Sequence, residues 1–212
     1  MRNTQMTADE AVRAIYIDFE GNMDMAPSVL GVRCDEETTQ FVIESALGSY
    51  AGLENSKYRV RRASMETLLE ELRRRSNTED RLVAGFTTHE VGIVDAFCVD
   101  EQLRNWFSGA YVNVKKPIDR WVRRQVESGW RAAPEDRSLV SYMPFIDLSY
   151  KPGCGPGIVG PGLKRLRDQM ALHGSASDVS KGTKLHWWRI LSHNATDLVA
   201  TQDLSCQSAE VI

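Results

Sequence analysis

One short segment places two carboxylates in what otherwise has the composition of a buried strand. Residues 14–20, with the sequence AIYIDFE, are apolar except for Asp18 and Glu20. Side chains at positions i and i+2 of a strand share a face, so the two acids project together while their neighbours point to the opposite side. Burying two adjacent carboxylates is costly unless a cation compensates them. The alternative is a strand that ends here, with both acids facing water, since Gly21 and Asn22 are turn residues.

The residue types indicate which cation would suit this pair. Carboxylate oxygens are hard ligands, which favour Mg²⁺ or Mn²⁺ over zinc. The 4 cysteines form no C-x-x-C pair and are scattered along the chain, so neither a zinc site nor a disulfide framework is indicated. We expect free thiols, two or three of them buried, at Cys34, Cys98, Cys154 and Cys206.

Length and hydropathy predict one domain that covers residues 1–212. A chain of 212 residues, 42% of them hydrophobic, is long enough for one well-packed core and short for two. No apolar run approaches the roughly 18 residues that cross a bilayer, and the N-terminal segment is polar rather than signal-like. We therefore expect a cytoplasmic protein without membrane contact.

Two common catalytic motifs are missing from the sequence. The chain lacks the phosphate-binding pattern G-x-x-x-x-G-K-[ST] and the nucleophile elbow G-x-S-x-G, which argues against a nucleotide triphosphatase and a serine hydrolase.

The charge distribution leaves room for a nucleic-acid partner. The net charge of -3 argues against a nonspecific nucleic-acid coat protein, but an enzyme needs positive potential only along its substrate track. Residues 58–64, 73–76 and 114–124 concentrate arginine and lysine. We expect a basic helical insertion at about 111–137 that contacts phosphates, with a solvated helix face as the alternative. The cations assigned to nucleic-acid binding are Lys115, Lys116, Arg120, Arg123 and Arg124.

Hydrophobic periodicity predicts an α/β fold that begins with an antiparallel meander. After the first strand, two short segments rich in Val and Ile are separated by polar turn material, as in consecutive antiparallel strands. The expected strands are 15–20, PSVLGVRC at 27–34, QFVIES at 40–45, RLVAGF at 81–86, and a strand or other extended segment in YMPFIDLSY at 142–150.

The helical segments follow from i, i+3, i+4 spacing. The clearest is residues 65–77, where Ser64 is available as the N-cap and Glu66 lies in the first turn. The other expected helices are 91–107, the basic helix from Lys115 to Arg131, 163–172, and a final helix from about Lys184 to Leu204. The Gly/Pro-dense residues 151–162 predict a loop without regular structure.

Two further groups of polar residues are candidates for chemistry. Glu90 follows the strand predicted at 81–86 and opens the next helix, where an acid is also a common helix cap. Asp95 lies one turn further on and competes for the same role. His193 and Asp197 are four residues apart, so they share one face of the last helix, although such a pair is commonly a solvated edge.

The order of these motifs resembles that of the DEDD exonucleases in the RNase H-like superfamily. YIDFEG matches the opening Asp-x-Glu of that family, and VAGFTTHE is similar to its second motif, with Glu90 where Asp is usual and Phe86 where Asn is common. HNATD has the spacing of the branch whose last motif carries Tyr and the residue type, His193, of the other branch. GPGLKRLRDQ is similar to the family's Leu-rich helix, and the resemblance extends from about Ala14 to Thr201.

This resemblance implies an RNase H-like mixed sheet of about five strands, antiparallel first and then parallel, with helices on both faces. It implies a metal-dependent 3′–5′ exonuclease acting on DNA or RNA, with a single-stranded 3′ end as the expected substrate. Two Mg²⁺ or Mn²⁺ ions would be held by Asp18, Glu20, Glu90 and Asp197, and His193 would accept the proton of the attacking water. A nucleic-acid or protein-binding module of the same fold without productive metal geometry is the alternative. Oligomeric state and the choice between DNA and RNA stay open.

Overall fold

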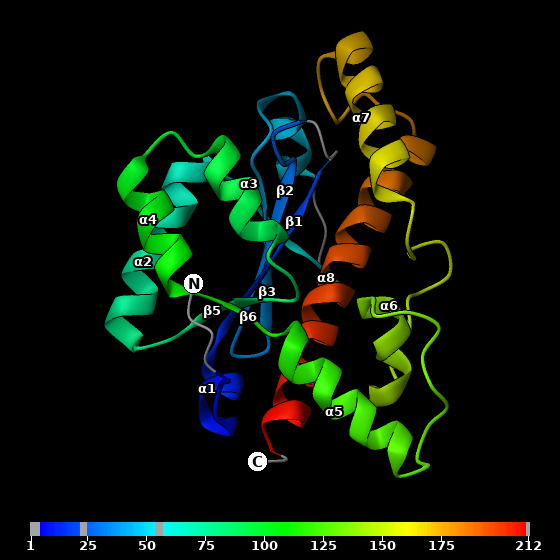
Figure 1. The fold of residues 1–212 in the computed structure, drawn as a ribbon. Coiled ribbons are helices and arrows are strands. Elements are labelled where there is room, and N and C mark those ends of the chain that lie inside the picture. The colour runs from blue at the N-terminus through cyan, green and yellow to red at the C-terminus, as the bar shows by residue number, and fades with distance from the viewer. Residues whose placement is uncertain (1–4, 22–24, 54–56, 211–212) are drawn as a thin grey trace.

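A mixed sheet lies at the centre of the chain, with helices packed on its two faces (Figure 1). The computed structural model describes residues 5–21, 25–53 and 57–210, so the chain ends of the predicted domain and the predicted turn residue Asn22 lie outside the described residues. The described residues form a 6-stranded sheet. Its strands are β1 (Ile15–Glu20), β2 (Val29–Cys34), β3 (Glu37–Val42), β4 (Arg59–Arg62), β5 (Val83–Gly85) and β6 (Tyr111–Asn113). The predicted α/β class is therefore confirmed.

The strand order confirms the predicted antiparallel start. The order is β4-β3-β2-β1-β5-β6, with β2 antiparallel to both β1 and β3 and the remaining neighbours parallel. Strand β1 lies between β2 and β5, so the acidic pair is on an interior strand, as expected. Ile17 and Phe19 belong to the core on one face, whereas Asp18 and Glu20 point to the other.

The sheet has 6 strands where about five were expected, and one strand assignment was wrong. The predicted extended segment at 142–150 instead contains the end of α6 (Leu139–Tyr142) and the 3₁₀ helix η2 (Met143–Ile146), after which residues 148–150 have no regular structure. Pro144 sits in the first turn of η2, where its missing N–H costs nothing. The two strands that were not predicted are β4, an edge strand with three exposed arginines, and β6, which has 3 residues. Neither shows the apolar alternation that identifies a strand.

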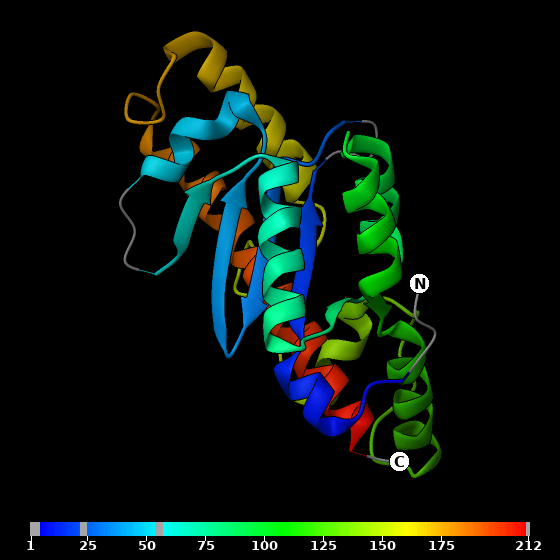
Figure 2. The same ribbon diagram turned by 90° about the vertical axis from the view of Figure 1, so that its left-hand side faces the viewer.

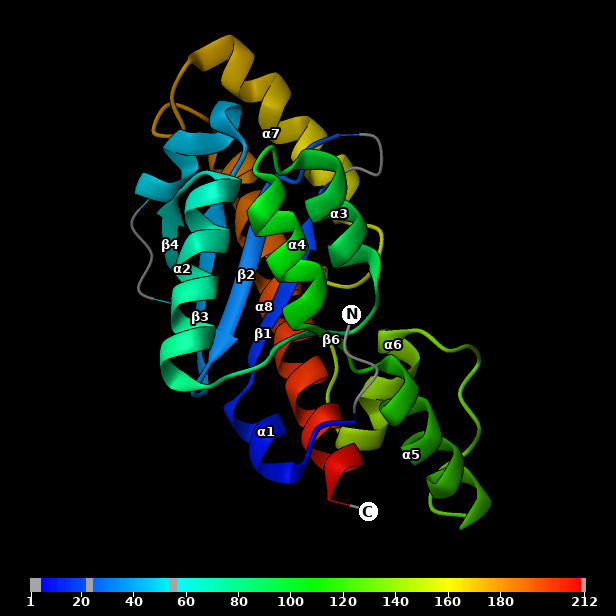
Figure 3. The same ribbon diagram turned by 60° about the vertical axis from the view of Figure 1, so that its left-hand side comes forward.

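Three helices cover the face that Ile17 and Phe19 reach: α2 (Met65–Glu79), α3 (His89–Phe97) and α4 (Glu101–Ala110) (Figure 3). Ser64 caps α2 as predicted, since its hydroxyl accepts the backbone N–H of Thr67 at 3.2 Å. The single helix expected at 91–107 is two helices, because the Asp100 side chain accepts the backbone N–H groups of Gln102 and Leu103 and starts α4.

The opposite face is covered by α8 (Lys181–Ala209), which starts three residues before the expected Lys184 and ends after the expected Leu204 (Figure 2). Helix α7 (Val159–His173) runs beside α8, so the last residues of the predicted Gly/Pro loop are helical. Helices on both faces of the sheet are thus confirmed. The remaining helical elements are α1 (Ala8–Arg13), η1 (Ser45–Gly52) and α5 (Lys115–Glu127).

The cysteines are free thiols, as expected. Cys34, Cys98 and Cys154 are buried, Cys206 is half-buried, and all four are free thiols. Among the helices of the described residues, not one combines the length and apolar character that crossing a membrane requires.

Gly31 allows α8 to lie directly on the sheet beside the acidic pair. It is the β2 partner of Asp18, and a Cβ at this position would lie 2.0 Å from Asn194 Oδ1 and 2.6 Å from Leu198 Cδ1, both on α8. Neither distance is compatible with a real side chain. Asn194 is also fully buried and accepts a hydrogen bond from Gln40 of β3, so the helix is anchored at this point.

Gly31→Ala should therefore destabilise the protein, because α8 must move away from β2 to admit one methyl group. We expect a loss of about 2 kcal/mol in the free energy of unfolding, measured by urea denaturation. Gly109→Ala on α4 is the matched control, since a Cβ there meets nothing within 4 Å and alanine favours a helix. Equal stability of the two variants would contradict this account of α8 packing.

Candidate functional site

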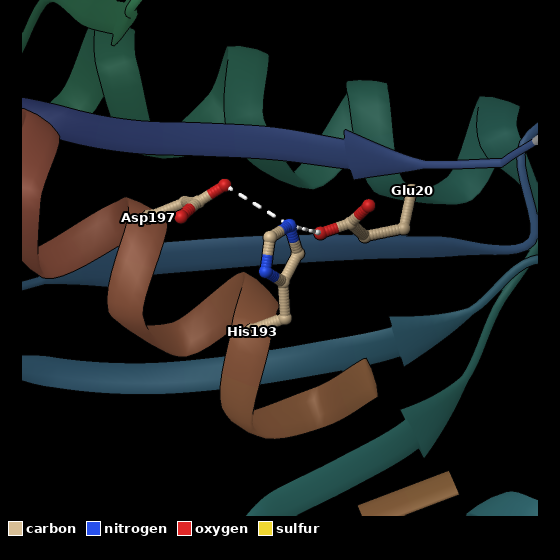
Figure 4. A group of neighbouring side chains, drawn as sticks. All are labelled: Glu20, His193 and Asp197. Atoms are coloured by element: carbon tan, nitrogen blue, oxygen red, sulfur yellow. Dashed lines mark ion pairs between the residues drawn. The ribbon is translucent and has the colours of Figure 1, made fainter. Parts of the chain in front are cut away.

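Strand β1 and helix α8 bring three polar side chains together: Glu20, His193 and Asp197 (Figure 4). One potential ligand atom from each lies within 4.8 Å of the others. His193 Nε2 is 3.4 Å from Asp197 Oδ2 and 3.9 Å from Glu20 Oε1, so the imidazole stands between the two carboxylates. His193 and Asp197 share a helix face because they are one turn apart. Two of the predicted motifs thus meet in space.

Asp18 lies next to this group on the same face of β1. The Asn194 side chain of α8 donates to Asp18 Oδ2 at 2.8 Å and to the Asp18 backbone carbonyl at 3.1 Å. Burial raises the pKa of Asp18 well above its usual value, and the charges of Glu20, Asp197 and Glu90 raise it further. The hydrogen bond from Asn194 opposes these effects. Each of the other three predicted acids therefore acts on the ionisation of Asp18.

Glu90 is buried at the start of α3 and has partners of its own. Its Oε2 accepts hydrogen bonds from Tyr111 Oη at 2.8 Å and from Thr87 Oγ1 at 3.3 Å. Burial raises its pKa, which these hydrogen bonds partly offset. Glu90 is not in the compact group of three, but it acts on Asp18. Asp95, the competing acid of the same helix, is exposed.

The carboxyl groups of the site hold their protons to unusually high pH, because the described side chains do not compensate the charge of their ionised forms. Burial raises the pKa of Glu20 to about 8, and the Asp197 charge adds to this effect. Burial also raises the pKa of Asp197, against the opposing influence of His193 and Tyr150. Glu20 Oε1 is buried and has no hydrogen-bond partner among the described residues. A hard divalent cation fits this donor set, since it would satisfy the orphaned oxygen and the charge together.

A loop outside the predicted motifs holds His193. The carbonyl oxygen of Cys154 lies 2.9 Å from His193 Nδ1, so Nδ1–H donates to it and Nε2 faces the acids. The Tyr150 ring stacks on the imidazole with centroids 4.9 Å apart and 14° between planes. The Tyr150 hydroxyl donates to Asp197 Oδ1, and burial raises the pKa of Tyr150, so it stays a donor. Neither Tyr150 nor Asn194 was predicted as a site residue, and no spacing in the sequence connects Tyr150 to α8.

A cleft opens beside these side chains. Its volume is about 670 Å³, and its wall combines the acidic group with apolar side chains from β1, α3 and the start of α7. The residues that line it include Phe19, Glu20, Ile93, Phe97, Val159 and His193. The wall of the cleft thus offers a ligand both charged and apolar contacts.

The basic helix α5 is amphipathic, with its apolar face in the core and most of its cations outside. Lys116, Arg120, Arg123 and Arg124 are exposed, and Lys115 is half-buried with its ammonium 5.5 Å from the Phe86 ring centre. Arg120 donates to the Gln5 side chain at 2.8 Å. Contact of this helix with phosphates stays a prediction.

Comparisons with protein-family models, with curated proteins and with solved structures found no match to this chain. The functional interpretation therefore depends on the residues and the geometry described above.

The raised pKa values predict that metal stabilises the protein more at high pH. Glu20 has a pKa of about 8 in the folded chain and roughly 4.3 when unfolded, so the folded state holds more protons between these values. The contribution of Glu20 to the free energy of unfolding is fully present below about pH 4 and is lost as pH rises through 8. A cation that replaces the protons restores this contribution. We expect Mn²⁺ to raise the melting temperature clearly at pH 8 and little at pH 5.

Two substitutions assign this effect to the site. Asp18→Asn should abolish the Mn²⁺-dependent shift at pH 8, because it removes one of the connected carboxylates. Asp95→Asn is the control, since that acid is exposed on α3, and should keep the shift. An equal Mn²⁺ shift in Asp18→Asn and the parent protein would show that the metal binds elsewhere.

Proposed function

We propose that this protein is a metal-dependent 3′–5′ exonuclease with an RNase H-like fold, which hydrolyses phosphodiester bonds of DNA or RNA. The observation that carries this proposal is the meeting of buried carboxylates from β1 and α8 around His193, with Glu20 Oε1 left without a partner. The antiparallel meander followed by parallel strands supports the fold assignment.

The four acids supply the ligands that two Mg²⁺ or Mn²⁺ ions need. Glu20 and Asp197 belong to the compact group around His193, Asp18 shares the β1 face of Glu20, and Glu90, at the start of α3, acts electrostatically on Asp18. When bound, such ions supply positive charge to the phosphoryl and leaving oxygens and promote ionisation of water. Hard oxygen donors with raised pKa values release protons when they take up these ions.

His193 is placed to receive the proton of the attacking water. With Nδ1–H donated to the Cys154 carbonyl, the neutral ring has its lone pair on Nε2, toward Glu20 and Asp197. Tyr150 keeps the ring in this plane by stacking on it and orients Asp197 through its hydroxyl. Asn194 keeps Asp18 turned toward the helix. In this proposal, Tyr150 and Asn194 orient the groups of the site, and His193 accepts the proton of the water.

A second candidate is a non-catalytic nucleic-acid-binding module of the same fold. The observation that favours it is the position of Glu90, whose Oε2 is already held by Tyr111 and Thr87. A Glu90 held in this way would not complete a metal site, and the protein would bind nucleic acid without hydrolysing it.

Hydrolysis is the deciding property. Purified protein with Mg²⁺ or Mn²⁺ should release mononucleotides from 3′-labelled single-stranded DNA or RNA, whereas Asp18→Asn should lose nearly all of this activity because it disrupts the metal site. Asp95→Asn, purified in the same way, should match the parent. Equal release by the parent and Asp18→Asn would indicate a contaminating nuclease, and binding without release would favour the second candidate.

His193→Ala tests the proton acceptor separately from metal binding. The rate should fall by roughly 10²–10⁴-fold, the usual contribution of general base catalysis, while the Mn²⁺-dependent melting shift persists. His173→Ala, at the exposed end of α7, is the control for loss of a histidine. Loss of the Mn²⁺ shift in His193→Ala would instead make the imidazole a metal ligand.

A further inference from the structure

The face of α8 that carries His193 and Asp197 continues as a basic surface toward the start of the helix. His186 and Arg189 precede His193 by seven and four residues, so all four side chains lie on one face. His186 and Arg189 are half-buried. The helix that supplies the proposed proton acceptor therefore also presents basic side chains, with Arg189 as the cation, along a line that starts at the site.

Arg189 packs on the loop that holds His193. A Cβ at Gly153 would lie 3.2 Å from Arg189 Nε, so the guanidinium lies directly over this glycine, whose φ is +73°. Lys151 lies two residues earlier, is exposed, and directly follows Tyr150, which stacks on His193. Lys151 and Arg189 thus lie on the two elements that position the imidazole.

Two more cations extend this surface. Lys57, just before β4, lies close enough to Lys151 that each ammonium alters the pKa of the other, lowering that of Lys151. Arg165 of α7 is exposed, and burial together with the Arg165 and Arg189 charges lowers the pKa of His186. The α8 basic patch comprises Lys57, Lys151, Arg165, His186 and Arg189.

Three cations of the patch, Lys151, Arg165 and Arg189, differ from some other arginines of the described residues in forming no ion pair with an acid. Among the ion pairs formed by described residues, none includes Lys151, Arg165 or Arg189. By contrast, Arg75 and Arg81 near the opposite face pair with Asp35 and Glu79. Gathered cations repel one another, and a bound polyanion relieves this repulsion.

We propose that the α8 basic patch binds the phosphates of a single-stranded nucleic acid whose terminal phosphodiester lies at Glu20, His193 and Asp197. This inference rests on the proposed exonuclease function and adds where the substrate chain runs. The patch adjoins the cleft through the Tyr150–Cys154 loop, so a chain that leaves the acidic group along α8 meets Arg189 next. Phosphate contacts of this kind supply affinity without reading base sequence.

Binding is measured by fluorescence anisotropy on single-stranded DNA and RNA of about 12 nucleotides, a length that spans a typical single-strand site. Asp18→Asn serves as the background, so that the oligonucleotide is not degraded. The test variant adds Lys151→Gln and Arg189→Gln. The control adds Arg73→Gln and Arg74→Gln on α2, which removes the same charge from the opposite face of the sheet.

The test variant should bind at least about 10-fold more weakly than the background protein, and the slope of log affinity against log salt should fall by about 1.4, or roughly 0.7 for each lost contact. The control should change neither quantity. Equal weakening in both variants, or an unchanged salt slope in the test variant, would overturn the inference.

Two further measurements keep the two proposals separable. If wild-type protein releases mononucleotides and the test variant binds normally, the patch assignment fails alone; if wild-type protein neither hydrolyses nor binds, both fail. Because Arg189 is half-buried, Lys57→Gln with Arg165→Gln, both exposed, repeats the test without risk to the loop. This second pair should also weaken binding and reduce the salt slope, and an unchanged slope would again overturn the inference.

Discussion

Burial of carboxylate charge where β1 meets α8 is the constraint on which the rest of the structure depends. Asp18 and Glu20 face a helix rather than water, and the described side chains offer them one amide, from Asn194, and one imidazole, from His193. The absence of a side chain at Gly31 lets that helix come close enough for the amide to reach Asp18. Packing and electrostatics therefore oppose each other here, because the contact that docks α8 also brings Asp197 toward acids that repel it.

This opposition explains the polar interactions around the site. Asn194 is held by Gln40 of β3, so its donor group stays directed at Asp18. Tyr150 supplies a hydroxyl to Asp197 and a ring to His193, and the Cys154 carbonyl fixes the remaining imidazole nitrogen. Among the described residues, Glu20 Oε1 at the wall of the cleft and Gln40 Oε1 on β3 are both buried without a hydrogen-bond partner. A cation that enters beside Glu20 would satisfy one of these two oxygens, while the contacts of Asn194, Tyr150 and Cys154 hold the neighbouring side chains in place, as in a preorganised ligand set.

The fold was predictable where hydrophobic pattern dominates and not where tertiary contacts do. The first three strands and α2 follow from alternation, apolar spacing and the Ser64 cap. Strand β4 is recognised only through its parallel pairing with β3, since its three arginines are exposed at the edge of the sheet. The break between α3 and α4 depends on one cap, Asp100, within a continuous helical pattern. The carboxylates of the site were detectable because charge in an apolar strand is unusual, whereas Tyr150 lies in a segment whose sequence suggested a strand.

Helix α8 connects these observations. One of its faces carries Asp197, His193, Arg189 and His186 in order, so a single helix sets the positions of the acid, the imidazole and the basic surface. The contact of Asn194 and Leu198 with Gly31 sets the distance between α8 and the sheet. Helix α7 limits sideways movement of α8, because a Cβ added at Gly162 of α7 would lie only 3.0 Å from Ile190 of α8. A displacement of α8 would therefore move the imidazole relative to Glu20 and, at the same time, the cations relative to the cleft. If the proposed function holds, the close helix-to-sheet contact has a role beyond packing, because it keeps the proposed proton acceptor and the proposed phosphate contacts at fixed positions relative to each other.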